Sequence, residues 1–199
     1  MDDRTAPQRE LHATDEQLQA VTLGQRRPHD APVTLVEYDP EWPATFEIEA
    51  VRIRAALGDQ LVRLEHTGST SVPGLAAKPV IDMTLTVPDS ADEPAYASRL
   101  AAAGYTLRIR EPDWLEHRLF KGPDADVNLH VFSDGSVELD RMLGFRDWLR
   151  SHAEDRDLYE RTKRALAART WRHVQHYADA KTEVVEEIIA RAGLPPRVD

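Results

Sequence analysis

The sequence predicts a single α+β domain with a helical C-terminal half. Short strand patterns mix irregularly with helices in the first two thirds of the chain, and helical periodicity dominates from Leu139 to Ala192. With 199 residues, of which 41% are hydrophobic and 30% charged, the chain is long enough to bury a sizeable core as one unit. The sequence shows no internal repeat.

The first 32 residues combine mixed charges and several prolines with few large apolar side chains. Such a composition cannot bury enough apolar surface to offset the entropy of ordering, so residues 1–32 are expected to form a mobile tail. A brief helix is predicted near residues 16–22 of this tail. The remaining residues, 33–199, are expected to form the one compact domain.

The elements of the domain follow from apolar spacing and from the positions of proline and glycine. Phe46, Ala50 and Ile53 recur at helical spacing after two prolines, and Gly58 is expected to end their helix. Gly104 is expected to end a later helix in the same way. In chain order the sequence predicts strands over 33–38, 61–65, 80–87 and 105–110, helices over 94–103 and from 139 to 192, and a hairpin over 117–132.

Composition and charge narrow the possible functions. The chain contains no cysteine, which excludes disulfides and thiolate metal sites. No run of about 18 apolar residues and no apolar signal core is present, so a cytoplasmic protein without a membrane partner is expected. The net charge of −10 opposes broad adhesion to nucleic acid, which requires many basic side chains. A small anionic ligand needs only a local positive pocket and stays compatible with this charge.

The most informative segment is HTGSTSVPGLAAKPVIDMTLT at residues 66–86. Gly68, Ser69 and Thr70 offer backbone donors and hydroxyls that suit an anion, and Lys78 adds positive charge nearby. Asp82 begins a strand on which alternate residues share a face, so it is expected on a polar face that could hold a divalent cation. The alternative is an ordinary loop of Gly, Ser and Pro with a turn-capping aspartate.

Two histidines form a second candidate group. His117 and His130 lie in the segments LEHRLFK and VNLHVF, and a loop centred on residues 122–125 would place them opposite each other in a hairpin. Imidazoles so placed bind a metal, accept a proton or contact a phosphate. The alternative is two ordinary strand histidines. His66 is expected to be a structural histidine that orders the Gly-Ser turn.

Two basic residues on the later helices are further candidates for phosphate contact. Arg146 falls on the same helical side as Leu139 and therefore needs a partner, which is either a structural acid or a phosphate. Lys181, in the segment YADAK, presents the same two possibilities.

Five segments in one order resemble the GrpB family, over roughly residues 33–192. They are VEYDPEWP at 36–43, EHTGSTSVPGLAAKPVIDM at 65–83, NLHVF at 128–132, FRDWLR at 145–150 and YADAK at 177–181. The resemblance implies a nucleotidyltransferase-like fold, a mixed sheet flanked by helices, in a family that sometimes occurs fused to dephospho-CoA kinase. In the wider superfamily, a Gly-Ser pair precedes two carboxylates, one residue apart, that hold divalent metal against a triphosphate.

This chain matches that pattern at Gly68, Ser69 and Asp82 but departs from it at Thr84, where the second carboxylate is expected. Two-metal phosphoryl transfer needs several anionic oxygens, and a threonine hydroxyl is a weak replacement. Magnesium also binds through one or two carboxylates plus substrate phosphates, so a site built on Asp82 alone stays possible. The candidates for a further acid, not ranked by the sequence, are Asp126, Glu65 and Glu116.

The leading hypothesis is a transferase that uses Mg²⁺ or Mn²⁺, a nucleoside triphosphate and a small acceptor. In it Gly68, Ser69 and Thr70 hold the triphosphate and Asp82 anchors the metal. Lys78, Arg146 and Lys181 neutralise phosphate charge, while His117 or His130 orients or deprotonates the acceptor. A second hypothesis is a nucleotide- or phosphate-binding module without turnover, which Thr84 favours. A third is an accessory interaction domain, which predicts an exposed apolar patch.

Overall fold

The computed structural model describes residues 12–124 and 126–198. Five strands form one mixed sheet in the order β1-β2-β5-β4-β3. The two central neighbours, β2 and β5, run parallel, whereas the other three pairings are antiparallel. The strands are β1 (Arg63–Thr67), β2 (Ile81–Val87), β3 (Thr106–Glu111), β4 (His117–Lys121) and β5 (Val127–Ser133).

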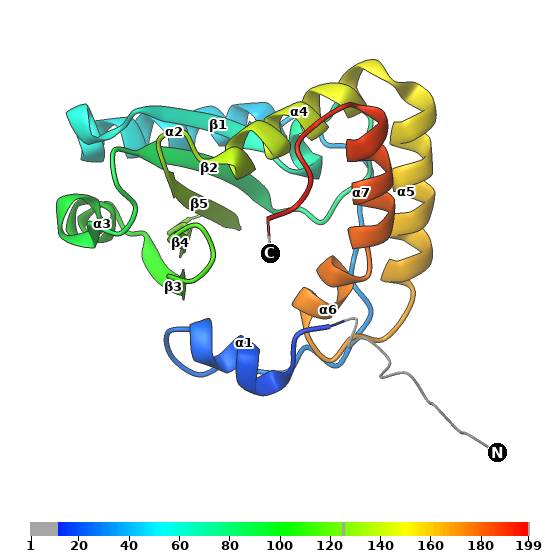
Figure 1. Ribbon diagram of the computed structural model, residues 1–199, viewed down its shortest axis with the longest axis horizontal. Coiled ribbons are helices and arrows are strands. Elements are labelled where there is room, and N and C mark those ends of the chain that lie inside the picture. Colours follow the sequence, from blue (N-terminus) through cyan, green and yellow to red (C-terminus); the bar gives the residue numbers. More distant parts are fainter. Residues whose placement is uncertain (1–11, 125, 199) are drawn as a thin grey trace.

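Seven α-helices accompany the sheet in the described part of the chain, so the α+β prediction with a helical C-terminal half is confirmed. Figure 1 shows α5 and α7 running side by side next to the sheet, with α1 below β3. The helices are α1 (Asp15–Val21), α2 (Trp42–Leu57), α3 (Glu93–Ala102), α4 (Val137–Ser151), α5 (Ala153–Ala167), α6 (Val174–Asp179) and α7 (Thr182–Arg191). Short 3₁₀ turns cover Gly58–Gln60 and Ser69–Ser71.

One face of the sheet packs against α2 and α3 and forms the main core. The alternation expected along β2 is confirmed, because Met83 and Leu85 are fully buried in this core while Asp82 and Thr84 face the other side. Burying each large aliphatic side chain contributes about 1.5–3 kcal/mol. The α2 helix that supplies the opposing layer has proline in its first turn and ends at Gly58, as its sequence predicts.

The other face of the sheet carries polar side chains and is only partly covered. Its cover comes from the turn Ser69–Ser71 and from α4, behind which α5 and α7 pack. A second apolar cluster holds this helical layer together; its buried members are Val72, Leu75, Leu149, Tyr159, Val184 and Ile188. The partly covered polar face is where the candidate site lies.

Two segments differ from expectation. Residues 33–38 do not form a strand of the sheet, because Val36 makes only an isolated bridge to Ala77 and Val33 hydrogen-bonds to the end of α5. Residues 12–32, expected to be mobile, lie against the domain through bridges at Thr22 and Ala31, and the predicted brief helix is α1. The predicted tail before His12 falls outside the described residues. None of the described helices has the length and apolar character needed to cross a membrane.

Candidate functional site

The polar face of the sheet opens into two adjoining cavities that share Ser69, Asp82 and Lys181. The smaller has a volume of about 50 Å³ and the larger about 250 Å³. Together they are lined by all the residues that the sequence predicts for phosphate and metal binding: Gly68, Ser69, Thr70, Lys78, Asp82, Arg146 and Lys181. The turn after β1, the start of β2 and the helical layer thus converge on one place.

Gly68 and Asp82 are in contact at the floor of this site. Gly68 has φ +66°, and a Cβ on it would lie 2.4 Å from Oδ2 of Asp82, closer than any real contact. Only glycine tolerates both the left-handed backbone and this approach. The Gly-Ser turn therefore requires glycine in order to sit against the carboxylate.

Gly68→Ala is expected to lower the free energy of unfolding by about 2 kcal/mol or more, since the new methyl group must displace Asp82 and also adopt a strained φ. Gly135→Ala is the matched control, because Gly135 has φ +77° but nothing within 4 Å of the added atom. That control should lose only about 1 kcal/mol. Urea denaturation of the two variants measures the difference, and equal losses would show that contact with Asp82 does not constrain Gly68.

Asp82 is held as an anion by its neighbours. Asn128, its register partner on β5, donates a hydrogen bond from Nδ2 to Oδ1 at 2.8 Å, and Nε2 of His130 lies 3.9 Å from the same oxygen. Burial raises the pKa of the carboxyl, but His130, Asn128 and Lys78 outweigh it, so the pKa of Asp82 lies below its usual value. With 29% of its side chain exposed, this ionised carboxylate faces the cavity.

Three lysines, Lys78, Lys163 and Lys181, line the smaller cavity together with Asp82. Nζ of Lys163 donates to Oγ of Ser69 at 3.1 Å and to the carbonyl oxygen of Ala76. Burial, reinforced by repulsion from Lys181, lowers the pKa of Lys163 to about 7, and burial likewise lowers the pKa of Lys78. Because cations outnumber anions here, the smaller cavity suits a ligand with negative charge.

Lys163 is the main site residue that the sequence analysis missed. It lies on α5 between Tyr159 and Ala167, at helical spacing, and all three are buried. A lysine in the buried stripe of a helix is the signal that would have singled it out, because such a group needs a partner.

His117 and His130 come together, but not in the predicted register. The residue opposite His130 is Leu119, because Lys121 pairs with Asn128 and the connecting loop is longer and less symmetric than expected. His117 therefore meets His130 diagonally on the same sheet face, with Nε2 3.0 Å from Nδ1 of His130. The expectation of directly opposed histidines was wrong, whereas the expected contact between them is present.

A hydrogen-bond chain fixes the protons of these rings. Nδ1 of His117 lies 2.6 Å from Oε2 of Glu111, and burial lowers the pKa of His117 to about 4, so that ring is neutral at pH 7. A neutral ring that donates from Nδ1 to Glu111 accepts at Nε2, which requires a proton on Nδ1 of His130. In a neutral His130 this leaves Nε2 with a lone pair on the side of Asp82, whereas the protonated ring directs an N–H toward that carboxylate, and in this form it lowers the pKa of Asp82.

Thr84, at the expected position of a second carboxylate, has a structural role. It is fully buried, its Oγ1 lies 2.9 Å from Oγ1 of Thr67, and it contacts Met142. The three acids considered as replacements are engaged with other cations: Glu65 with Arg63 and Arg146, Asp126 with Lys121, and Glu116 with Arg118. Within residues 12–124 and 126–198, no group of three acidic or histidine side chains is placed to hold a metal ion.

Two predicted phosphate ligands also have structural partners. The guanidinium of Arg146 donates to Oε2 of Glu65 and to the carbonyl oxygen of His66, both at 3.0 Å. Thr70 donates to the carbonyl oxygen of Val80 and lies 3.1 Å from Nε2 of His66. The expected structural role of His66 in ordering the turn is thereby confirmed. Phosphate contact by Arg146 and Thr70 stays a prediction.

A family model, related sequences and a solved structure were compared with this chain, and their results agree with one another. The model of a family described as GrpB protein matches residues 32–191. A UPF0157 protein from Halalkalibacterium halodurans is 63% identical over 180 residues, which cover 90% of this chain and 92% of that protein. A dephospho-CoA kinase from Mycolicibacterium paratuberculosis is 31% identical over an alignment covering 87% of this chain and 49% of the kinase. The crystal structure of GrpB from Enterococcus faecalis superposes with a TM-score of 0.68 at 27% identity, covering 79% and 98% of the two chains.

Proposed function

The chain belongs to the GrpB family, and on that premise we propose that it binds a nucleoside triphosphate beside Asp82 and transfers a nucleotidyl or phosphoryl group to a small acceptor. The observation that carries the proposal is the convergence of Ser69, Lys163 and Asp82 from three separate parts of the chain on one cavity. The nucleotidyltransferase-like fold that the family resemblance implies supports the same conclusion.

The triphosphate is expected in the smaller cavity and at its opening. Lys163 is already hydrogen-bonded to Ser69, so a phosphate oxygen at this point gains both a charged donor and a hydroxyl. Lys78 and Lys181 line the same wall and neutralise further charge. Burial weakens the hydration of Lys78 and Lys163, which makes an anionic partner more favourable to each of them than it would be at the surface.

The protein groups in this cavity fit magnesium only when the phosphates of the nucleotide also bind the ion. Among the described residues, Asp82 is the one carboxylate on the cavity floor, since Thr84 is buried and hydrogen-bonded elsewhere. Magnesium keeps several waters and binds through one or two carboxylates plus substrate phosphates, which matches a single aspartate. The ion then supplies charge neutralisation to the phosphates, and Asp82 holds it at the cavity floor.

The acceptor is expected beside His130. In nucleotidyl transfer, the acceptor oxygen attacks the α-phosphorus, the bond from that phosphorus to the α–β bridging oxygen breaks, and pyrophosphate leaves. Nε2 of His130 takes the acceptor proton, because Glu111 and His117 hold the ring in the tautomer with its lone pair toward Asp82. Solvent then receives the proton from His130.

A non-catalytic binding module is the second candidate, and the buried Thr84 favours it, because a two-metal arrangement lacks its second acid. The accessory-domain hypothesis has less support. It requires an exposed apolar patch, and Ile48 and Val51 on α2, each 64% exposed, form only a small one.

Release of pyrophosphate, from nucleotidyl transfer, or of nucleoside diphosphate, from phosphoryl transfer, separates the two leading candidates. The protein is incubated with each nucleoside triphosphate, Mg²⁺ and a panel of hydroxyl acceptors, beside a His130→Gln variant. A transferase gives acceptor-dependent release that the variant loses by about 10²-fold or more. Tight triphosphate binding without release of either product in the presence of any acceptor supports the binding module. Absence of triphosphate binding contradicts both.

A further inference from the structure

A further cavity, separate from the two around Asp82 and called the basic cavity below, lies between β3, β4 and the segment that follows α1. It has a volume of about 510 Å³, and four basic side chains, Arg26, Arg27, Arg108 and Lys121, line it. No carboxylate contributes to its wall within the described part of the chain. In a chain of net charge −10, such a concentration of positive charge needs an explanation.

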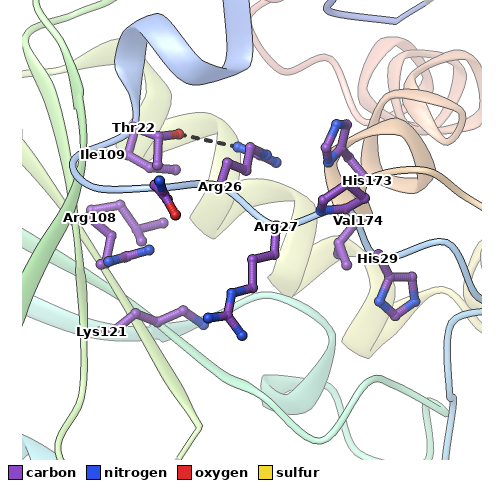
Figure 2. Close-up of a pocket in the computed structure, with 12 residues that line it drawn as sticks. Thr22, Arg26, Arg27, His29, Arg108, Ile109, Lys121, His173 and Val174 are labelled. Carbon is purple, nitrogen blue, oxygen red and sulfur yellow. Dashed lines mark hydrogen bonds between the residues drawn. The ribbon is translucent and has the colours of Figure 1, made fainter. Parts of the chain in front are cut away.

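These cations are only partly neutralised by protein groups. Figure 2 shows Arg27 and Lys121 pointing toward each other within the cavity. Lys121 pairs with Asp126 at 3.3 Å, and Arg26 donates to the hydroxyl of Thr22 at 3.3 Å and is attracted by the nearby Asp15 and Asp179. Among the described residues, Arg27 and Arg108 have no carboxylate within 4.0 Å. Like charges brought together without an anion repel one another, so a bound anion would stabilise this arrangement.

The basic cavity opens on the same sheet face as the site around Asp82. Asp82 pairs with Asn128 on β5, and Asn128 pairs with Lys121 on β4, so the three form one row across adjacent strands. Two strand spacings separate the ends of this row, roughly 10 Å. Leu119, on the floor of the basic cavity, is the register partner of His130.

We propose that the basic cavity binds the phosphate groups of the acceptor, which is therefore a phosphorylated small molecule with a free hydroxyl that reaches His130 on the neighbouring strand. The inference rests on the proposed function for its substrate role. Guanidinium groups bind phosphate through paired donors, and a phosphate monoester carries nearly two charges, which several clustered cations match better than one carboxylate would.

Calorimetric titration with inorganic pyrophosphate at low ionic strength tests the proposal. The native chain is expected to show two classes of site. Arg27→Gln with Arg108→Gln should weaken one class at least tenfold and leave the other within twofold, while Lys163→Met should do the reverse. A double variant at two exposed, ion-paired arginines that line neither site, Arg54→Gln with Arg191→Gln, controls for lost charge and should change neither class by more than twofold.

Each outcome has a distinct meaning. If pyrophosphate binding is unchanged when Arg27 and Arg108 are replaced, the inference is overturned and the nucleotide site is unaffected. Binding that depends on these arginines but not on Lys163 overturns the proposed nucleotide site and leaves the basic cavity as an anion site. A single-stranded oligonucleotide that displaces pyrophosphate from the basic cavity and binds more tightly would overturn the assignment to a small molecule.

Discussion

Asp82→Asn is expected to abolish the stabilisation of the protein by a magnesium nucleoside triphosphate. A ligand at about a hundred times its Kd stabilises the folded state by about 2.7 kcal/mol. In a domain of this size, that corresponds to a rise in Tm of roughly 5–10 °C. Asparagine keeps the size of Asp82 and still accepts the hydrogen bond of Asn128, but it removes the charge that holds the metal.

Thermal unfolding with and without the magnesium nucleotide measures this effect. Asp59→Asn is the matched control, because Asp59 is an exposed aspartate whose partner, Arg99 at 3.8 Å, does not line the cavities around Asp82. The control should keep the full shift in Tm, and Asp82→Asn should show less than a quarter of it. A full shift in Asp82→Asn would place the nucleotide elsewhere or make its binding independent of the metal.

Lys163→Met is expected to weaken triphosphate binding at least tenfold at pH 6.5 and to remove most of its pH dependence. Burial lowers the pKa of Lys163 to about 7 in the empty cavity, so above pH 7 its neutral amine must take up a proton when the anion binds. The affinity of the native chain should therefore fall by up to tenfold per pH unit above about 7. The variant, which lacks this titrating amine, should give a much flatter profile between pH 7 and 8.

Stability provides an independent check on the same group. Between pH 7 and the ordinary lysine value of 10.5, the unfolded chain retains the Lys163 proton that the folded chain has released. The unfolding free energy of the native chain should therefore rise with pH in this window relative to Lys163→Met. Arg161→Met, an exposed substitution on the same helix, is the control and should leave both profiles unchanged. Parallel profiles for the native chain and Lys163→Met would show that the buried ammonium does not titrate near 7.

Much of the fold could be predicted because the information is local. The periodicity of Phe46, Ala50 and Ile53 defines α2, and the alternation around Met83 assigns the two faces of β2 correctly. The motif at residues 65–83 predicted the residues on the floor of the site, since Gly68 and Asp82 both belong to it and are in contact.

What the sequence did not predict depends on long-range packing. Lys163 reaches Ser69 across 94 residues of chain, and although its spacing from Tyr159 and Ala167 indicates burial, local sequence does not specify the partner that it meets. The relative register of His117 and His130 depends on how the hairpin loop closes, which residue types alone do not specify. Arg27 and Arg108 both line the basic cavity, but they are far apart in the sequence and belong to no common motif.

A crystal structure grown with a non-hydrolysable nucleoside triphosphate and Mn²⁺ tests the central claim most directly. Binding beside Asp82 predicts an anomalous manganese peak within coordination distance of its carboxylate, with phosphate oxygens against Ser69 and Lys163. A triphosphate bound away from this cavity, or manganese bound away from Asp82 while nucleotide is present, would contradict the account.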